Sequence, residues 1–113
     1  MKVSQGEIVE VNFLLPDGRT KPHPTIVLSN NDINIYEEAF IGVMISSNAP
    51  NDNYSFWLEN NMVTKTPKSK CQVRCHLISL IPENQVIGRH GSIKKQYLRE
   101  LLIKINECVF DID

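Results

Sequence analysis

The chain has 113 residues, of which 42% are hydrophobic and 22% are charged, a balance typical of a single folded domain spanning residues 1–113. Its 12 basic and 13 acidic residues leave a net charge of -1, which argues against a strongly basic nucleic-acid binder, so any site for a nucleic acid must be a local cluster. The chain contains no apolar run of membrane-spanning length and does not begin like a secretory signal, so we expect a cytoplasmic protein with no membrane partner.

Two strands are predicted near the start of the chain. Residues 7–13 alternate apolar and polar side chains, as in a strand with one buried face. Residues 19–24 are polar and contain two prolines, which predicts an extended loop. A second strand is then expected at 25–29.

The apolar run at residues 39–47 predicts a central strand that is buried on both faces. Its end is polar, because it finishes in the hydroxyls of Ser46 and Ser47. A surface loop at 48–53 and a short aromatic strand at 54–58 are expected next.

The longest predicted strand begins at Cys71 after a basic loop. Its alternation places Gln72, Arg74 and His76 on one face, which could line a cleft, and Cys71 and Cys75 on the other. The chain has three cysteines, an odd number that argues against a disulfide framework. Two small buried hydrophobes are a better interpretation of this cysteine pair than a zinc site.

The pattern changes near the end of the chain. A brief strand is predicted at 86–89, and His90 is interpreted as a turn residue. From Ser92, a plausible N-cap, apolar residues recur at helical spacing as far as Val109. About six short strands followed by one amphipathic helix indicate a mainly β (α+β) fold and a small barrel.

Four stretches, in this order and spacing, resemble the MazF/PemK-like toxin family over nearly the whole chain. They are Gly6–Val11, Lys21–Ser29, Val73–His76 and Ile87–Arg89. The family typically opens with a G-[DE]-[IV] motif, continues with an R-P strand entry, and has a G-[KR] step before its last helix.

This resemblance implies an SH3-like β-barrel that forms a homodimer and acts as the toxin of a toxin–antitoxin system. Such toxins are endoribonucleases (mRNA interferases) that cleave single-stranded RNA with no metal and no cofactor. A base removes the proton of a ribose 2'-hydroxyl, the oxygen attacks phosphorus, and an acid protonates the departing 5'-oxygen. The implied partners are RNA and a cognate antitoxin, with DNA contacted only through the antitoxin.

Carried over residue by residue, the resemblance implies four catalytic positions. Arg74 would stabilise charge, His23 and His76 would be the acid and base, and Ser46 would contact the phosphate. The chain departs from the family pattern at three positions. His23 replaces the arginine of the R-P entry, His76 replaces an aspartate, and Ser79 replaces a further arginine.

The predicted substrate-binding residues are Arg19, Lys21, Ser47 and Lys68. Without the resemblance, Arg74 would be interpreted as a strand arginine paired with a surface carboxylate. Two other functions stay open: a catalytically silent barrel that binds RNA or a protein partner, and an unrelated SH3-like interaction module whose polar residues do not converge.

Overall fold

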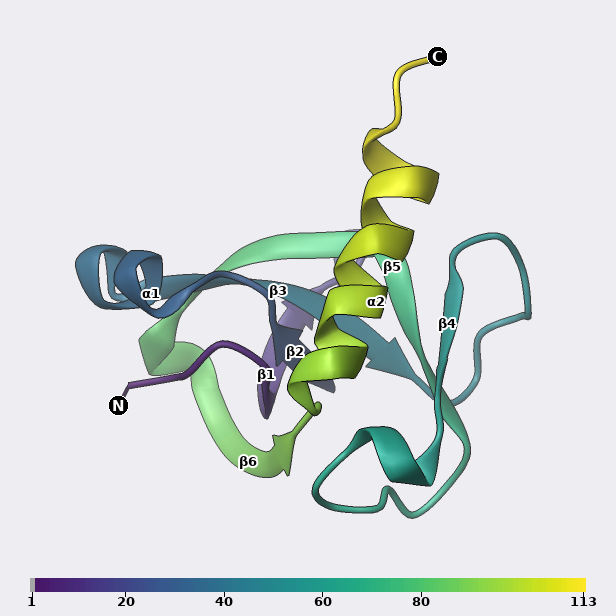
Figure 1. The fold of residues 1–113 in the computed structure, drawn as a ribbon. Coiled ribbons are helices and arrows are strands. Elements are labelled where there is room, and N and C mark those ends of the chain that lie inside the picture. The colour runs from purple at the N-terminus through teal and green to yellow at the C-terminus, as the bar shows by residue number, and fades with distance from the viewer. Residues whose placement is uncertain (1) are drawn as a thin grey trace.

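The computed structural model describes residues 2–113. Within this range six strands form one antiparallel sheet in the order β4-β5-β3-β2-β1-β6 (Figure 1). In chain order the elements are β1 (Glu7–Leu14), β2 (Thr20–Val27), α1 (Asn31–Glu37), β3 (Ala39–Ser46), β4 (Ser55–Leu58), the 3-10 turn η1 (Asn60–Met62), β5 (Cys71–Pro82), the 3-10 turn η2 (Glu83–Gln85), β6 (Val86–Ser92), α2 (Lys95–Ile105) and the π-helical η3 (Asn106–Phe110).

The predicted mainly β fold with a C-terminal helix is confirmed. The sheet curves but does not close into a complete barrel in the part of the chain described, because β4 and β6 are its two edges. An isolated bridge between Val63 and Ile93 and hydrogen bonds between Thr64 and Ser92 link the segments near these two edges. No helix among residues 2–113 is long and apolar enough to cross a membrane.

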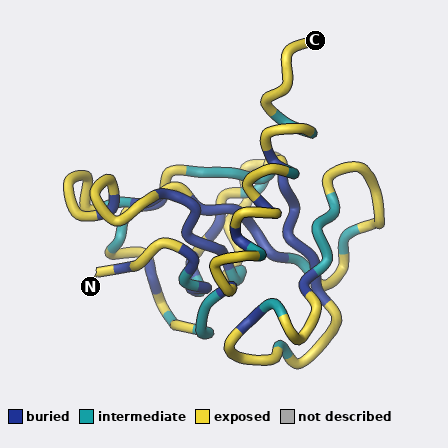
Figure 2. Tube along the Cα trace, in the orientation of Figure 1, coloured by how far each residue is buried: buried dark blue, intermediate teal, exposed yellow. Residues whose placement is uncertain are grey.

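Apolar side chains are buried on both faces of the sheet (Figure 2). On one face α2 packs through Leu98, Leu101 and Ile105, and the same cluster contains Cys71 and Cys75. The two cysteines are therefore buried hydrophobes, as expected. The other face encloses a second apolar cluster around Phe40, while η3 and the last residues project beyond the sheet (Figure 1).

The prediction of a loop at residues 19–24 is wrong, since residues 20–24 form the first part of β2. Pro22 and Pro24 are tolerated there because β3 pairs only with residues 25–27 of β2. The first half of β2 has β1 as its one neighbour in the sheet. On its other side no strand lacks a hydrogen-bond donor because of the two prolines.

The structure also differs from the prediction in one additional helix and in the start of the last helix. The Asn/Asp-rich connection contains α1, whose N-cap Asn30 accepts a hydrogen bond from the backbone N–H of Ile33. The last helix begins after Lys94 and not at Ser92. Ser92 belongs to β6, where it pairs with Glu7 of β1, and it also exchanges two hydrogen bonds with Thr64.

Candidate functional site

A cavity of about 620 Å³ lies at the end of the sheet where β2 and β3 approach the 63–71 loop. It contains four of the eight predicted site residues: His23, Ser46, Ser47 and Lys68. The remaining lining residues come from all six strands or the residues next to them and from the 63–71 loop. They are Ile8, Glu10, Pro22, Pro24, Ile45, Asn48, Leu58, Val63, Lys65, Thr66, Pro67, Ser69, Cys71 and His90.

Strand register explains why His23 and Ser46 meet although they are distant in the sequence. Thr25 of β2 pairs with Met44 of β3. The strands are antiparallel, so His23, two residues before Thr25, and Ser46, two residues after Met44, lie toward the same end of the sheet. Because side chains alternate along a strand, His23 and Ser46 also lie on the same face of the sheet. Ser46 in turn stands opposite Gln72 of β5.

His23 is half-buried, and its surroundings favour the neutral imidazole. Burial lowers the pKa of His23 below its ordinary value of 6.5, and the positive charge of Lys21 lowers it further. The carboxylate of Glu10 acts in the opposite direction with a smaller effect. A neutral imidazole near pH 7 can accept a proton, which is the requirement for a general base.

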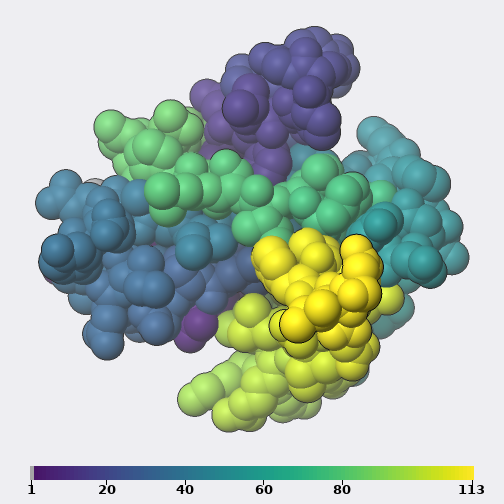
Figure 3. Space-filling model, turned by 90° about the horizontal axis from the view of Figure 1, so that it is seen from above, coloured from purple at the N-terminus to yellow at the C-terminus, as the bar shows by residue number. Residues whose placement is uncertain are grey.

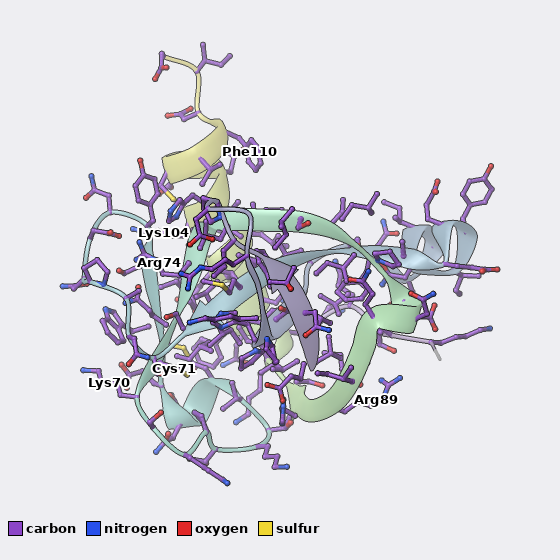
Figure 4. All side chains as sticks on the ribbon, turned by 180° about the vertical axis from the view of Figure 1, so that it is seen from behind. Lys70, Cys71, Arg74, Arg89, Lys104 and Phe110 are labelled. Carbon is purple, nitrogen blue, oxygen red and sulfur yellow. The ribbon has the colours of Figure 1, made fainter. Side chains whose placement is uncertain are left out.

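Arg74 does not line the cavity, and its side chain is only 7% exposed. The guanidinium pairs with Asp52 in a two-pronged ion pair, with Nη1 and Nη2 at 3.0 and 2.9 Å from the two carboxylate oxygens. Nη1 also donates to the carbonyl of Pro50, to Ser55 Oγ and to Gln72 Oε1. Arg74 therefore holds the 48–55 segment against β5 (Figure 4).

The hydrogen bonds of this segment change the interpretation of the polar face of β5. Gln72 is 1% exposed and donates to the carbonyls of Ala49 and Pro50. The guanidinium of Arg74 lowers the pKa of Asp52 to about 2, well below its ordinary range. Gln72 and Arg74 are thus covered by a loop and do not line an open cleft in this conformation.

His76 is exposed and lies outside the cavity. Its ring stacks at a tilt on Tyr54, with 4.4 Å between the ring centroids. Partial burial lowers the pKa of His76, and the nearby charge of Arg74 acts in the same direction. His76 and Arg74 therefore belong to a second cluster, centred on the 48–55 segment.

Arg19 and Lys21 also lie outside the cavity lining. Arg19 is part of the segment that joins β1 and β2, where it forms an exposed ion pair of 2.7 Å with Asp17. This segment protrudes from the molecule at the top of Figure 3. Lys21 is exposed in the first half of β2, close enough to His23 to influence its pKa.

Sequence reasoning did not assign Glu10, Lys65 or His90 to the site, although all three line the cavity. The alternation in 7–13 was the only signal for Glu10, since it places this side chain away from buried Val9 and Val11. His90 lies within β6 and is not a turn residue. Among residues 2–113, no group of three or more His, Cys, Asp and Glu side chains is arranged to hold a metal ion.

Residues 4–109 match a protein family described as PemK-like, MazF-like toxin of type II toxin–antitoxin system. No curated protein sequence matches the chain. Solved structures with a similar fold include MazF (Form-I) from Deinococcus radiodurans, with a TM-score of 0.79 and 14% identity over 98% of this chain and 99% of that chain. An endoribonuclease in complex with its cognate antitoxin from a mycobacterial species has a TM-score of 0.76 and 11% identity over 98% of each chain. The Mycobacterium tuberculosis toxin MazF-mt6 has a TM-score of 0.74 and 15% identity over 95% of this chain and 98% of that chain.

Proposed function

Since the chain belongs to the PemK-like, MazF-like toxin family, we propose that it is the toxin of a toxin–antitoxin system and cleaves single-stranded RNA without a metal. One observation carries the proposal. The cavity contains an imidazole suited to act as a base, His23, beside two hydroxyls and two lysines, which together suit a phosphodiester. The description of the mycobacterial structure as an endoribonuclease supports the same activity.

In the proposed reaction the neutral ring of His23 accepts the proton of the ribose 2'-hydroxyl. The 2'-oxygen attacks the adjacent phosphorus, and the bond from phosphorus to the 5'-oxygen breaks. Ser46 donates a hydrogen bond to a non-bridging phosphate oxygen, while Lys65 and Lys68 offset the charge that develops there. The products are a 2',3'-cyclic phosphate and a 5'-hydroxyl end.

The predicted roles of the residues outside the cavity remain part of this proposal. Arg74 would have to exchange Asp52 for a phosphate in order to bind substrate directly. His76 would reach substrate only if RNA extends over the 48–55 segment. Arg19 and Lys21 would contact RNA that leaves the cavity along β2.

The proposal includes a cognate antitoxin and a homodimer, contact with DNA only through the antitoxin, and no cofactor. The antitoxin-bound mycobacterial structure supports the first of these partners, as does the MazE-MazF complex from Deinococcus radiodurans. An antitoxin segment that folds across the cavity would block RNA.

A second candidate function is a catalytically silent barrel that binds RNA or a protein partner. This candidate is favoured because Asp52 neutralises the charge of Arg74 and because position 23 holds a histidine in place of the family's arginine. In this candidate the cavity would still bind the phosphate backbone, but RNA would stay intact.

The test is incubation of the purified protein with a long single-stranded RNA in EDTA, followed by chemical analysis of the new ends. We expect discrete cuts that carry cyclic phosphates, and we expect His23→Ala to abolish them. The exposed Arg99→Ala on α2 is the matched control and should cut like the wild type. Intact RNA with a folded wild-type sample would favour the silent barrel.

A further inference from the structure

Glu10 and His90 are hydrogen-bonded to each other in the wall of the cavity, and the reaction steps proposed above do not use them. Glu10 Oε2 lies 3.1 Å from His90 Nε2. Their side chains are 32% and 40% exposed, so both are partly shielded and still accessible to a ligand. An imidazole beside a carboxylate, facing a cavity, is a common arrangement in acid–base catalysis.

The fold fixes this pair from two sides. Glu10 of β1 is paired with Gly88 of β6, two residues before His90. Gly91 has a φ of +82°, and a Cβ there would lie 2.6 Å from Thr64 Oγ1. Two hydrogen bonds between Thr64 and Ser92 join the end of β6 to the loop that carries Lys65.

The chemistry of RNA cleavage requires a second group of this kind. When His23 removes the 2'-hydroxyl proton, the 5'-oxygen leaves on the opposite side of phosphorus and needs a proton. His23 reaches the cavity from β2, whereas His90 reaches it from β6. His76 lies outside the cavity, so His90 is the other histidine that contacts the same space.

We propose that His90 is a catalytic acid of this cavity, which donates a proton to the departing 5'-oxygen of RNA, and that Glu10 is its positioning residue. The inference rests on the proposed ribonuclease function. The carboxylate of Glu10 accepts the Nε2–H of His90, which fixes the ring and leaves Nδ1–H as the proton donor. His23 gains one proton and His90 loses one, and exchange with water restores both.

The charged and titratable groups around His90 fit this role. Glu10 is its direct partner, and the other such groups that line the cavity are Lys65, Lys68, His23 and the thiol of Cys71. The neighbouring Arg89 is engaged elsewhere, in an ion pair with Glu7 and a hydrogen bond to the carbonyl of Lys2.

The test uses a short RNA that contains a site cut by the wild-type protein, made in two forms. One has the normal 5'-oxygen at the cut, and the other has sulfur there, because a thiolate leaves without being protonated. We expect His90→Ala to slow cleavage of the oxygen substrate by about 10²- to 10⁴-fold and to leave cleavage of the sulfur substrate nearly unchanged. Glu10→Gln should give a smaller loss with the same selectivity, and Arg99→Ala should leave both rates unchanged.

Two results would overturn this assignment while leaving the ribonuclease proposal intact. One is wild-type cleavage of the oxygen substrate by a folded His90→Ala variant. The other is an equal loss of cleavage rate on both substrates, which would indicate a structural role. If the alanine variant does not fold, His90→Gln is the second variant to be measured. A folded wild-type protein that leaves every long single-stranded RNA intact, so that no such site can be found, would instead refute the proposed function and this inference with it.

Discussion

Replacing Arg74 by alanine should destabilise the fold, because the guanidinium is enclosed by the segment that it holds. It donates hydrogen bonds to Pro50, Asp52, Ser55 and Gln72. Gln72 is 1% exposed, so its Oε1 would lose a donor in a buried position, at a cost of about 1–3 kcal/mol. The lost packing of the arginine stem adds about 1 kcal/mol, which gives a total decrease in unfolding free energy of about 2–4 kcal/mol.

Urea unfolding at pH 7, followed by circular dichroism, measures this effect. In a thermal scan followed by the same signal, the melting temperature should fall by about 8–16 °C, at about 4 °C per kcal/mol for a chain of this size. The exposed Arg99→Ala should change the unfolding free energy by less than about 0.5 kcal/mol. If Arg74→Ala unfolds like the wild type and yet no longer cuts RNA, the guanidinium serves the substrate and our structural reasoning is refuted.

Three other measurements test the electrostatics and the core. The Arg74 guanidinium lowers the pKa of Asp52 from 3.8 to about 2, so the pair should stabilise the fold fully above pH 3.8 and progressively less as the pH falls toward 2. Asp52→Asn should remove this part of the acid transition in a circular-dichroism titration. Burial lowers the pKa of His23 below 6.5, so protonation of this base should reduce the cleavage rate with a midpoint below pH 6.5, and a midpoint above that value would contradict its role. Leu101→Ala should cost about 2–5 kcal/mol of unfolding free energy, because this side chain of α2 is fully buried, whereas Leu102→Ala should cost less than about 1 kcal/mol, because Leu102 is 38% exposed. Equal losses in denaturant titrations would show that α2 is packed differently.

The strands with strong apolar patterns were predicted close to their observed bounds. The run that became β3 is continuously apolar and the run that became β5 is long and begins with alternating apolar and polar residues, so local pattern alone identifies them. The first half of β2 was missed because prolines normally interrupt a sheet, and only the tertiary pairing shows that this half has a single neighbour. The start of α2 was placed too early because serine is a good helix cap, whereas Ser92 in fact pairs with Glu7 of β1 as the last residue of β6.

The candidate site was predictable only in part. His23 and Ser46 were found because the family resemblance assigns site positions to them, and the structure brings them into one cavity. Glu10 and His90 were missed because their proximity depends on the β1–β6 register, which the sequence pattern does not contain. The pairing of Arg74 with a carboxylate was anticipated as an alternative, but its partner in the 48–55 segment was not.

The most direct test of the central claim is chemical rescue at position 23. His23→Gly removes the imidazole and leaves additional space in a cavity of about 620 Å³. Single-turnover cleavage of RNA should be lost in this variant and should return, in proportion to its concentration, when free imidazole is added. Wild-type cleavage without imidazole, or no recovery at any concentration in a folded variant, would contradict a base at His23 and with it the assignment of this cavity as the active site.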